Sequence, residues 1–277
     1  MNHLFRELAP ISKPGWEEIE KEAKRTLRAL LAARRLVDFV GPLGWGASDV
    51  ELGRSEPIEP PPKATGVQAR LRRIQPLVEL RISFEVSREE LAAIDRGARD
   101  PDLDSVTAAA REIAIAEDRA VFHGYPFAGI VGICEAQDGA AVSLGADHSD
   151  YPVAVAAALN KLRDAGVNGP FALALNEQLY KDLTARTDGG YPILSHVQRL
   201  LDGPSVWAPG LDGAVVVSMR GGDFELTVGQ DFSIGYLDHT SDKVRLYIEE
   251  SFTFLILSPQ AAVPLVNTAP AKGAKAR

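Results

Sequence analysis

The chain has 277 residues, of which 45% are hydrophobic and 25% are charged, values typical of a globular protein. The 38 acidic and 30 basic residues give a formal net charge of −8, which argues against a general nucleic-acid-binding protein. The single cysteine, Cys134, excludes an internal disulfide and a cysteine-rich zinc site, and it fits a reducing, cytoplasmic compartment. Apolar runs such as Phe252–Leu257 are too short to cross a bilayer, so we expect no membrane span.

Residues 14–40 are predicted to form an amphipathic helix that starts after a capping Ser12 and ends at Gly41-Pro42. Arg34 and Asp38 are one turn apart on this helix, which predicts an exposed ion pair worth about a few tenths of a kcal/mol. The apolar stripe recurs at spacings of three and four residues: Trp16, Ile19, Ala23, Leu27, Leu30 and Leu31.

Residues 43–75 are rich in glycine and proline and show little periodicity. Segments within this region alternate, as in Val67, Ala69 and Leu71, which indicates strands. We therefore predict a projecting two-stranded arm over residues 48–80. Because the arm has little apolar surface to bury on itself, the pattern implies a partner chain.

Next along the chain, residues 77–86 predict a strand and residues 87–97 a short helix. Residues 104–123 predict the longest clear helix, capped by Asp104 and ended by Gly124.

From residue 125 the pattern alternates between helices and strands. Helices are predicted at Val153–Ala165, Glu177–Thr184 and Ile193–Leu201. Strands are predicted at Phe171–Leu175, Ser205–Ala208, Ala214–Ser218, Phe224–Val228, Ile234–Leu237, Val244–Glu250 and Phe252–Leu257. The polar tail over 268–277 is predicted to be disordered.

The common catalytic and metal-binding motifs are missing from the sequence. His123 is interpreted as a helix-end residue and Cys134 as a small buried hydrophobic residue. The run Asp147–Asp150 lacks the glycine and distal glutamate of a calcium loop and is interpreted as a turn before a helix. Tyr191 is either a loop anchor or an exposed stacking platform. The residues alone predict an acidic α/β protein with no catalytic centre and no metal site.

Several long blocks resemble one family, the family 1 encapsulin shell proteins, close to the actinobacterial type and once called linocin-like bacteriocins. The resemblance runs from about Asn2 to Leu265. Its blocks are LAPISKPGWEEIEKEAKRTLRALLAARRLVDFVGPLGW, PLVELRISFEVSREELAAIDRG, EDRAVFHGYPFAGIVGI, VNGPFALALN and RGGDFELTVGQDFSIGYLDHTSDKVRLYIEESFTF.

The resemblance implies an α+β fold, the HK97-like fold of tailed-phage major capsid proteins, with peripheral and axial domains and an extended loop. The implied parts are the N-terminal helix and start of the peripheral domain over 1–47, the extended loop over 48–80, a peripheral segment with the spine helix over 81–127, the axial domain over 128–220, peripheral return strands over 221–265 and a disordered tail over 266–277.

The implied function is structural rather than enzymatic. About 60 copies would close into the smallest icosahedral shell in the bacterial cytoplasm. The shell would enclose a cargo enzyme, a dye-decolorising peroxidase or a ferritin-like protein, which carries a C-terminal targeting peptide. No nucleic acid, membrane or cofactor is implied as a partner.

In the family the targeting peptide docks on the inner wall, against the first helix and late strands. The matching positions here are Leu31, Arg34, Val37, Asp38, Ile234 and Tyr236. The resemblance predicts that exchanging charges, Arg34→Glu with Asp38→Arg, leaves the shell intact but empties it.

A second group of positions matches the axial loop that surrounds the fivefold pore in the family: Thr187, Asp188, Gly189, Gly190, Tyr191 and Pro192. Asp188 would add negative charge at the opening and favour cations. Some relatives bind flavin through a tryptophan in the helix after FEVS, where this chain has Glu89-Glu90. We therefore predict no bound flavin.

Two alternatives remain open from the sequence. A hydrolase, as in the old bacteriocin and protease label, needs a nucleophile, a base and an orienting group, which no segment offers at recognisable spacing. A monomeric ligand-binding α/β domain leaves the arm at 48–80 unexplained.

Overall fold

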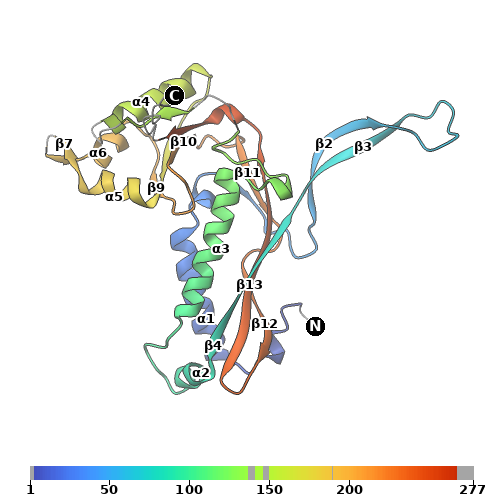
Figure 1. The fold of residues 1–277 in the computed structure, drawn as a ribbon, viewed down its shortest axis with the longest axis vertical. Helices are drawn as coiled ribbons and strands as arrows, with labels where there is room; N and C mark the ends of the chain where they lie inside the picture. Colours follow the sequence, from blue (N-terminus) through green and yellow to red (C-terminus); the bar gives the residue numbers. More distant parts are fainter. Residues whose placement is uncertain (1–2, 137–140, 146–149, 189, 267–277) are drawn as a thin grey trace, which may run out of the picture.

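The computed structural model describes residues 3–136, 141–145, 150–188 and 190–266. Within these ranges the chain forms an elongated body with a lobe of short helices at one end and a long arm on one side (Figure 1). Its α-helices are α1 (Lys13–Leu30), α2 (Arg88–Asp95), α3 (Asp104–His123), α4 (Tyr151–Asp164), α5 (Glu177–Ala185) and α6 (Ile193–Gln198). None of the helices in these ranges is long and apolar enough to cross a membrane.

Helix α1 ends at Leu30, ten residues earlier than the sequence predicts. The carboxylate of Asp118, on α3, accepts hydrogen bonds from the backbone N–H groups of Ala32 and Ala33 at 3.0 and 2.9 Å. These bonds start a separate 3₁₀ turn, η2 (Ala33–Arg35), after which the chain enters strand β1 (Asp38–Val40). The predicted helix over 31–40 is therefore wrong, because a distant side chain satisfies the N–H groups that a continuing helix would use.

The predicted N-terminal caps of α1 and α3 are partly confirmed. Ser12 caps α1 as predicted, since its hydroxyl oxygen accepts from the N–H of Gly15. Asp104, however, is the first residue of α3, and the capping position is Leu103, which makes no side-chain cap. Gly124 follows the last residue of α3, as predicted.

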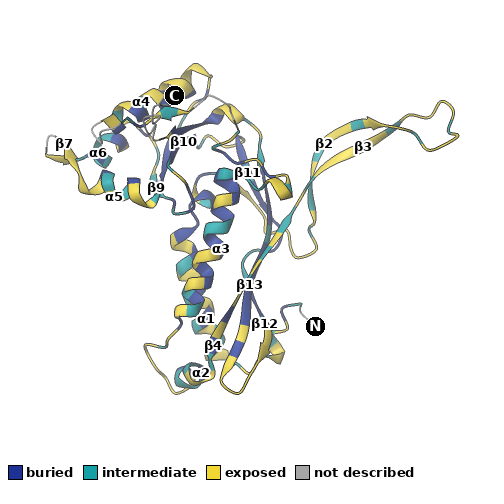
Figure 2. Ribbon diagram, in the orientation of Figure 1, coloured by how far each residue is buried: buried dark blue, intermediate teal, exposed yellow. Residues whose placement is uncertain are grey.

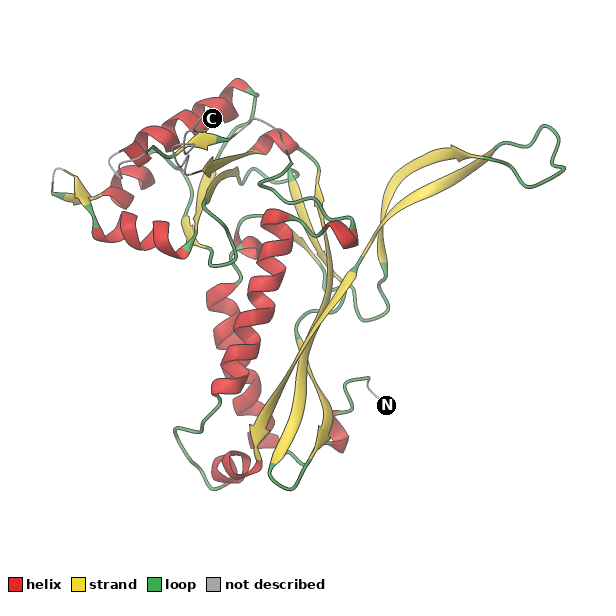
Figure 3. Cartoon of the chain, viewed as in Figure 1, coloured by secondary structure: helices red, strands yellow, loops and turns green. Residues whose placement is uncertain are grey.

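The first sheet has the order β1–β11–β13–β12, with β4 also paired to β13. Its strands beyond β1 are β4 (Val78–Ser87), β11 (Phe224–Val228), β12 (Ser233–His239) and β13 (Lys243–Ile256). Helix α3 packs on β4 and β13, and α1 packs on α3 (Figure 3).

Strand β13 is a single element of 14 residues, whereas the sequence pattern predicts two strands that break at Ser251. Strand β4 pairs with it from Lys243 to Phe252, and β11 takes over from Phe252 to Ile256. The two partners overlap at Phe252, so the ladder holds the backbone extended through the predicted break.

The second sheet has the order β5–β14–β10–β6–β9. Its strands are β5 (Val142–Ser143), β6 (Phe171–Leu175), β9 (Ser205–Trp207), β10 (Ala214–Ser218) and β14 (Ala262–Val266). Every residue of β6 and β10 is buried, which explains their continuous apolar runs. The segment 221–265 thus supplies β11, β12 and β13 to the first sheet and most of β14 to the second sheet.

The predicted two-stranded arm is confirmed as the antiparallel pair β2 (Asp49–Ile58) and β3 (Ala69–Pro76). It extends away from the body, and most of its residues are exposed (Figure 2). An isolated two-stranded ribbon is at best marginally stable in water. The arm therefore needs contacts that its own body does not supply.

Candidate functional site

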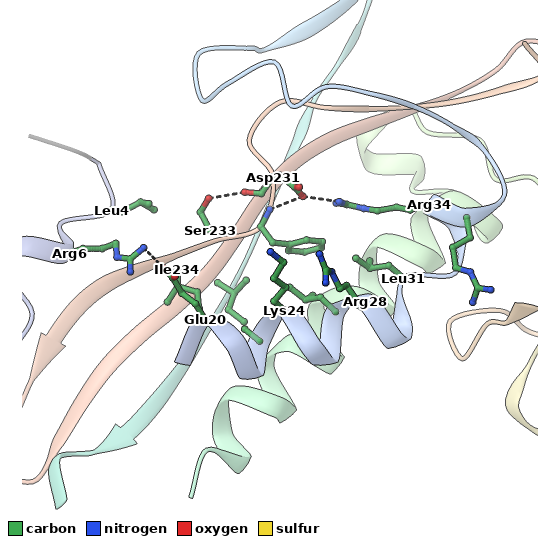
Figure 4. A pocket seen from close by; sticks show the side chains of 15 residues that line it. Leu4, Arg6, Glu20, Lys24, Arg28, Leu31, Arg34, Asp231, Ser233 and Ile234 are labelled. Carbon is green, nitrogen blue, oxygen red and sulfur yellow. Dashed lines mark hydrogen bonds and ion pairs between the residues drawn. The ribbon is translucent and has the colours of Figure 1, made fainter. Parts of the chain in front are cut away.

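A groove of about 680 Å³ lies between α1, the start of β12 and the N-terminal segment (Figure 4). Apolar side chains, each at most 9% exposed, line its floor: Ala23, Leu27, Leu31, Ile234 and Ile248. Charged side chains stand around it: Arg6, Glu20, Lys24, Arg28, Arg34, Arg35 and Asp231. The groove combines an apolar floor with a charged rim.

Local sequence explains how these residues meet. Ala23, Leu27 and Leu31 are spaced by four, so they lie in one row along α1 and just past its end. The N-terminal segment is held beside β12, since the N–H of Tyr236 donates to the carbonyl of Leu4 at 2.9 Å. Gly235 is required next to it, because a Cβ there would overlap the ring of Tyr247.

The rim is positively charged on balance. Arg6 pairs with Glu20 at 2.6 Å and stacks over the ring of Trp16. Lys24, Arg28 and Arg35 form no ion pair with the residues that the structure describes. These three unpaired cations beside an apolar floor can attract a carboxylate.

Arg34 also lines the groove but differs from the other cations, because only 15% of its side chain is exposed. Its Nε and Nη2 atoms donate to the carboxylate of Glu117 at 2.5 to 3.0 Å. Nη1 donates to Asp231 at 2.7 Å, and Nη2 donates to Glu250 at 3.1 Å. Since the side chains of Glu117 and Glu250 are fully buried, Arg34 is the charge that balances the interior under the groove.

Three carboxylates face this one guanidinium, which leaves an excess of buried negative charge. Burial opposes the charge of Arg34, but its hydrogen bonds to Glu117 and the charges of Glu117, Glu250 and Asp231 raise its pKa. Burial and the neighbouring Glu117 raise the pKa of Glu250 well above its usual value. Burial likewise raises the pKa of Asp118 to about 7, although the N–H donors of Ala32 and Ala33 oppose the shift. Glu250 and Asp118 therefore hold a proton to a higher pH than an exposed carboxyl does.

The structure brings together three of the six predicted docking positions. Leu31, Arg34 and Ile234 all line the groove. Tyr236 lies farther along β12, where its hydroxyl contacts Nδ1 of His239 at 2.5 Å. The sequence-based prediction omitted Lys24 and Arg28 from the site, although their position beside the apolar stripe of the first helix was a usable signal.

Val37 and Asp38 lie elsewhere, around a separate cavity of about 80 Å³. The predicted ion pair between Arg34 and Asp38 is wrong, because Asp38 starts β1 and accepts a hydrogen bond from the N–H of Gly222 at 2.6 Å. Exchanging the charges of Arg34 and Asp38 consequently restores no pair. The structure argues against the expectation that this double variant leaves the shell intact, since Arg34→Glu would place another carboxylate against Glu117 and Glu250.

The predicted pore loop forms a small hairpin of β7 (Thr187–Asp188) and β8 (Tyr191–Pro192). Gly190 has φ of 86°, a conformation that glycine adopts without strain. Tyr191 is 60% exposed, and its ring meets the edge of His196. Gly189 and the side chain of Asp188 lie outside the described residues.

Other candidate reactive groups have ordinary structural surroundings. Burial raises the pKa of the Cys134 thiol to about 12, so the thiolate that a nucleophile requires is disfavoured. Nε2 of His123 accepts a hydrogen bond from the N–H of Asp212 at 2.9 Å. No group of three metal-binding side chains occurs among the described residues; residues 147–149 of the acidic turn lie outside them.

Comparison with known proteins adds independent evidence. Residues 1–253 match the family model Linocin_M18, described as an encapsulating protein for peroxidase. The chain is 57% identical over 270 residues to the type 1 encapsulin shell protein of Rhodospirillum rubrum, with 96% of each chain covered. It is 48% identical over 265 residues to that of Rhodococcus erythropolis, covering 96% of this chain and 100% of the relative.

Solved structures show the fold. A virus-like particle from Pyrococcus furiosus aligns with a TM-score of 0.61 at 18% identity, covering 91% of this chain and 99% of that one. The capsid of an empty GTA particle aligns with a TM-score of 0.55 at 16% identity, covering 86% and 90%. The fold is that of HK97-like capsid proteins, as the sequence resemblance implied.

These relatives are named as shell proteins rather than enzymes, and nothing among them supports the hydrolase alternative. The projecting arm and the capsid fold agree with a subunit that assembles in many copies. The chain belongs to the family of type 1 encapsulin shell proteins, the structural subunits of bacterial nanocompartments.

Proposed function

We propose that about 60 copies of the chain close into an icosahedral shell in the bacterial cytoplasm, around a cargo enzyme held by a C-terminal targeting peptide. The description of the matching family, an encapsulating protein for peroxidase, supports a dye-decolorising peroxidase as cargo. A ferritin-like protein is the second candidate for the same position. The implied peripheral and axial domains, with boundaries at 80, 127 and 220, belong to the same proposal.

The groove beside α1 carries the docking part of the proposal. Its apolar floor suits two or three aliphatic side chains of an extended peptide, whose burial is worth about 1.5–3 kcal/mol each. A C-terminal peptide also ends in a carboxylate. Lys24, Arg28 and Arg35 supply unpaired cations at the rim for that charge. The docking residues that we propose are Leu27, Leu31 and Ile234 on the floor and Lys24, Arg28 and Arg35 on the rim.

The experiment is to co-express cargo with two matched variants, Ile234→Glu and Leu237→Glu. Both residues lie on β12, but Ile234 lines the groove, whereas Leu237 is 40% exposed and lies outside it. We expect Ile234→Glu shells to hold about tenfold less cargo, because the new carboxylate removes apolar contact and repels the peptide terminus. Leu237→Glu shells should load normally. Equal loading of both variants would contradict docking in the groove.

The hairpin β7–β8 is proposed as the fivefold pore loop, with Asp188 favouring cations. Its two-residue strands and exposed Tyr191 suit a loop at an opening. The measurement is uptake of size-matched cationic and anionic probes by empty shells, repeated with Asp188→Asn. We expect faster cation uptake that Asp188→Asn reduces; equal rates in the parent would contradict this role.

A further inference from the structure

The arm contains a hollow between β2 and β3 that no other part of the described chain fills. Between Glu51 and Ser55 the register of β2 against β3 shifts in a β-bulge, with Gly53 at φ of 65°. A hollow of about 250 Å³ opens at this bulge, lined by Glu51, Gly53, Arg54, Ser55, Arg72, Arg73 and Ile74.

The hollow is rich in cations that lack anionic partners. Arg73 pairs with Glu56 at 3.3 Å, which accounts for one arginine. Arg54 and Arg72 are exposed and form no ion pair with any residue that the structure describes, and Glu51 in the same hollow is not bonded to them. Neighbouring Arg70 donates to Ser55 and has no carboxylate partner in the described part of the chain, so it adds a third cation.

The geometry of the arm excludes its own body as the source of the missing anions. The arm extends away from the body (Figure 1), and its anchoring contact is at its base, where Gln75 donates to the carbonyl of Ala128 at 2.9 Å. Residues beyond the base are exposed along both strands (Figure 2). In an assembly of identical copies, the surface available to fill the hollow belongs to a second copy.

The carboxylates of α1 are already neutralised within the body. On α1, all four carboxylates in the first turns are paired, in Lys13–Glu17, Lys21–Glu18, Arg6–Glu20 and Arg25–Glu22. Such a surface has little charge left to offer a partner.

The corner formed by α2 and the loop before α3 is different, and we call it the acidic corner. It contains two exposed arginines, Arg96 and Arg99, against six carboxylates, so residues 89–104 carry a net charge of −4. The six carboxylates form no ion pair within the described residues: Glu89, Glu90, Asp95, Asp100, Asp102 and Asp104. Three of these serve local hydrogen bonds, in which Asp95 accepts from Ser12, Glu90 from the N–H of Asp102 and Asp102 from the N–H of Asp104. The other three, Glu89, Asp100 and Asp104, are exposed and remain available, and Glu89 and Asp100 are the two that we use below.

We propose that the arginine hollow of the arm receives the acidic corner of a second copy, through Arg54 and Arg72 on one copy and Glu89 and Asp100 on the other. Arginine is suited to this contact, because its planar fork binds a carboxylate through two parallel hydrogen bonds. The charges set which surfaces of neighbouring copies meet, and closure of the shell repeats the contact around each symmetry axis. The inference rests on the proposed shell and identifies the contact that orients each arm on a neighbouring copy.

The test is a charge exchange within one chain. Arg54→Glu with Arg72→Glu should lower the yield of closed particles about tenfold at low salt, because it sets like charges against each other. Adding Glu89→Arg and Asp100→Arg to that variant should restore closure to within about twofold of the parent. The matched control is Lys63→Glu, which changes charge on the same arm but outside the hollow. It should close like the parent.

A second variant tests the contact without reversed charge. Arg54→Gln with Arg72→Gln should weaken the salt dependence of closure seen in the parent, because salt screens exposed charge pairs. Circular dichroism melting of dissociated subunits checks folding, which should be unchanged because neither arginine reaches the core.

Three results decide the inference. Normal closure by the Arg54→Glu, Arg72→Glu variant at low salt would overturn it. So would failure of the corner reversal to restore closure, since the partner would then lie elsewhere. A parent chain that forms no closed particles would instead contradict the proposed function, so the two failures are distinguishable.

Discussion

Two sets of cations lie at the same groove and have different roles. Lys24 and Arg28, on the exposed side of α1, have no ion pair within the described chain and project at the rim. Arg34, just past the helix end, is bonded to Glu117, Asp231 and Glu250 and is mostly buried. Lys24 and Arg28 are therefore free to bind a ligand, whereas the guanidinium of Arg34 is already bonded to carboxylates of the protein itself.

Variants of the two sets are expected to fail for different reasons. Truncating Arg34 leaves two buried carboxylates without their counter-charge, so loss of cargo in such a variant would report on folding. Changing Lys24 or Arg28 leaves no buried group unpaired. The exposed rim residues can therefore test docking cleanly, whereas variants of the floor residues, which also belong to the core, need a check that closed shells still form.

The largest effect is expected for Arg34→Ala. It removes the one guanidinium that balances Glu117 and Glu250, and breaking such buried pairs costs about 3–5 kcal/mol. The measurement is the urea unfolding midpoint at fixed protein concentration, with Arg28→Ala as control, which should stay within about 0.5 kcal/mol of the parent. Equal stability of Arg34→Ala and Arg28→Ala would contradict the structural role assigned to Arg34.

The next effect is expected for Lys24→Glu with Arg28→Glu. Reversing both rim charges should weaken binding of a soluble targeting peptide about tenfold at low salt, with little change in stability. Binding is measured by fluorescence polarisation at two salt concentrations, and the difference from the parent should shrink as salt rises. Undiminished affinity at low salt would mean that the rim does not contact the peptide.

Glu250→Gln tests the buried carboxylates around Arg34 through the pH dependence of stability. Because burial and Glu117 raise the folded-state pKa of Glu250, the folded chain keeps a proton that the unfolded chain has lost. The parent therefore loses stability as pH rises from the ordinary carboxyl range through the raised value. Glu250→Gln should lose less over the same range, while Asp118, with its pKa of about 7, still contributes to the decline. Equal slopes of melting temperature against pH in the parent and the variant would contradict this.

The smallest effect is expected for Asp38→Ala, which removes the acceptor for the N–H of Gly222. The cost is about 1 kcal/mol, measured by thermal melting, and cargo loading should be unchanged. Loss of loading without loss of stability would return Asp38 to the docking site.

Local patterns in the sequence predicted much of the fold but little of the buried charge network. The stripe of α1, the alternation of β4 and the glycine-rich approach to the arm each depend on neighbouring residues, and they indicated elements that the structure contains. The end of α1 was missed because Asp118, 86 positions from Ala32, supplies the hydrogen bonds that stop it. A separation of four residues suggested Asp38 as the partner of Arg34, whereas its partners are 83 to 216 positions away.

The site was reached through family resemblance more than through chemistry. Leu31 and Ile234 were named because they match family positions, and the structure places both on one groove. Lys24 and Arg28 were overlooked because an exposed charge on an amphipathic helix is ordinarily solvated. Their position beside the apolar stripe of α1 is visible in the sequence, but the groove that gives it meaning comes from the tertiary structure.

The most direct test of the central claim is an electron cryo-microscopy reconstruction of the cargo-loaded shell, with the native mass of the same preparation. We expect about 60 subunits, a shell mass of about 1.8 MDa for a chain of 29.8 kDa. We also expect extended peptide density along α1, over Leu31 and Ile234. A closed, loaded shell whose peptide density lies away from this groove would contradict the docking site. A monomer or dimer in mild buffer would contradict the shell itself.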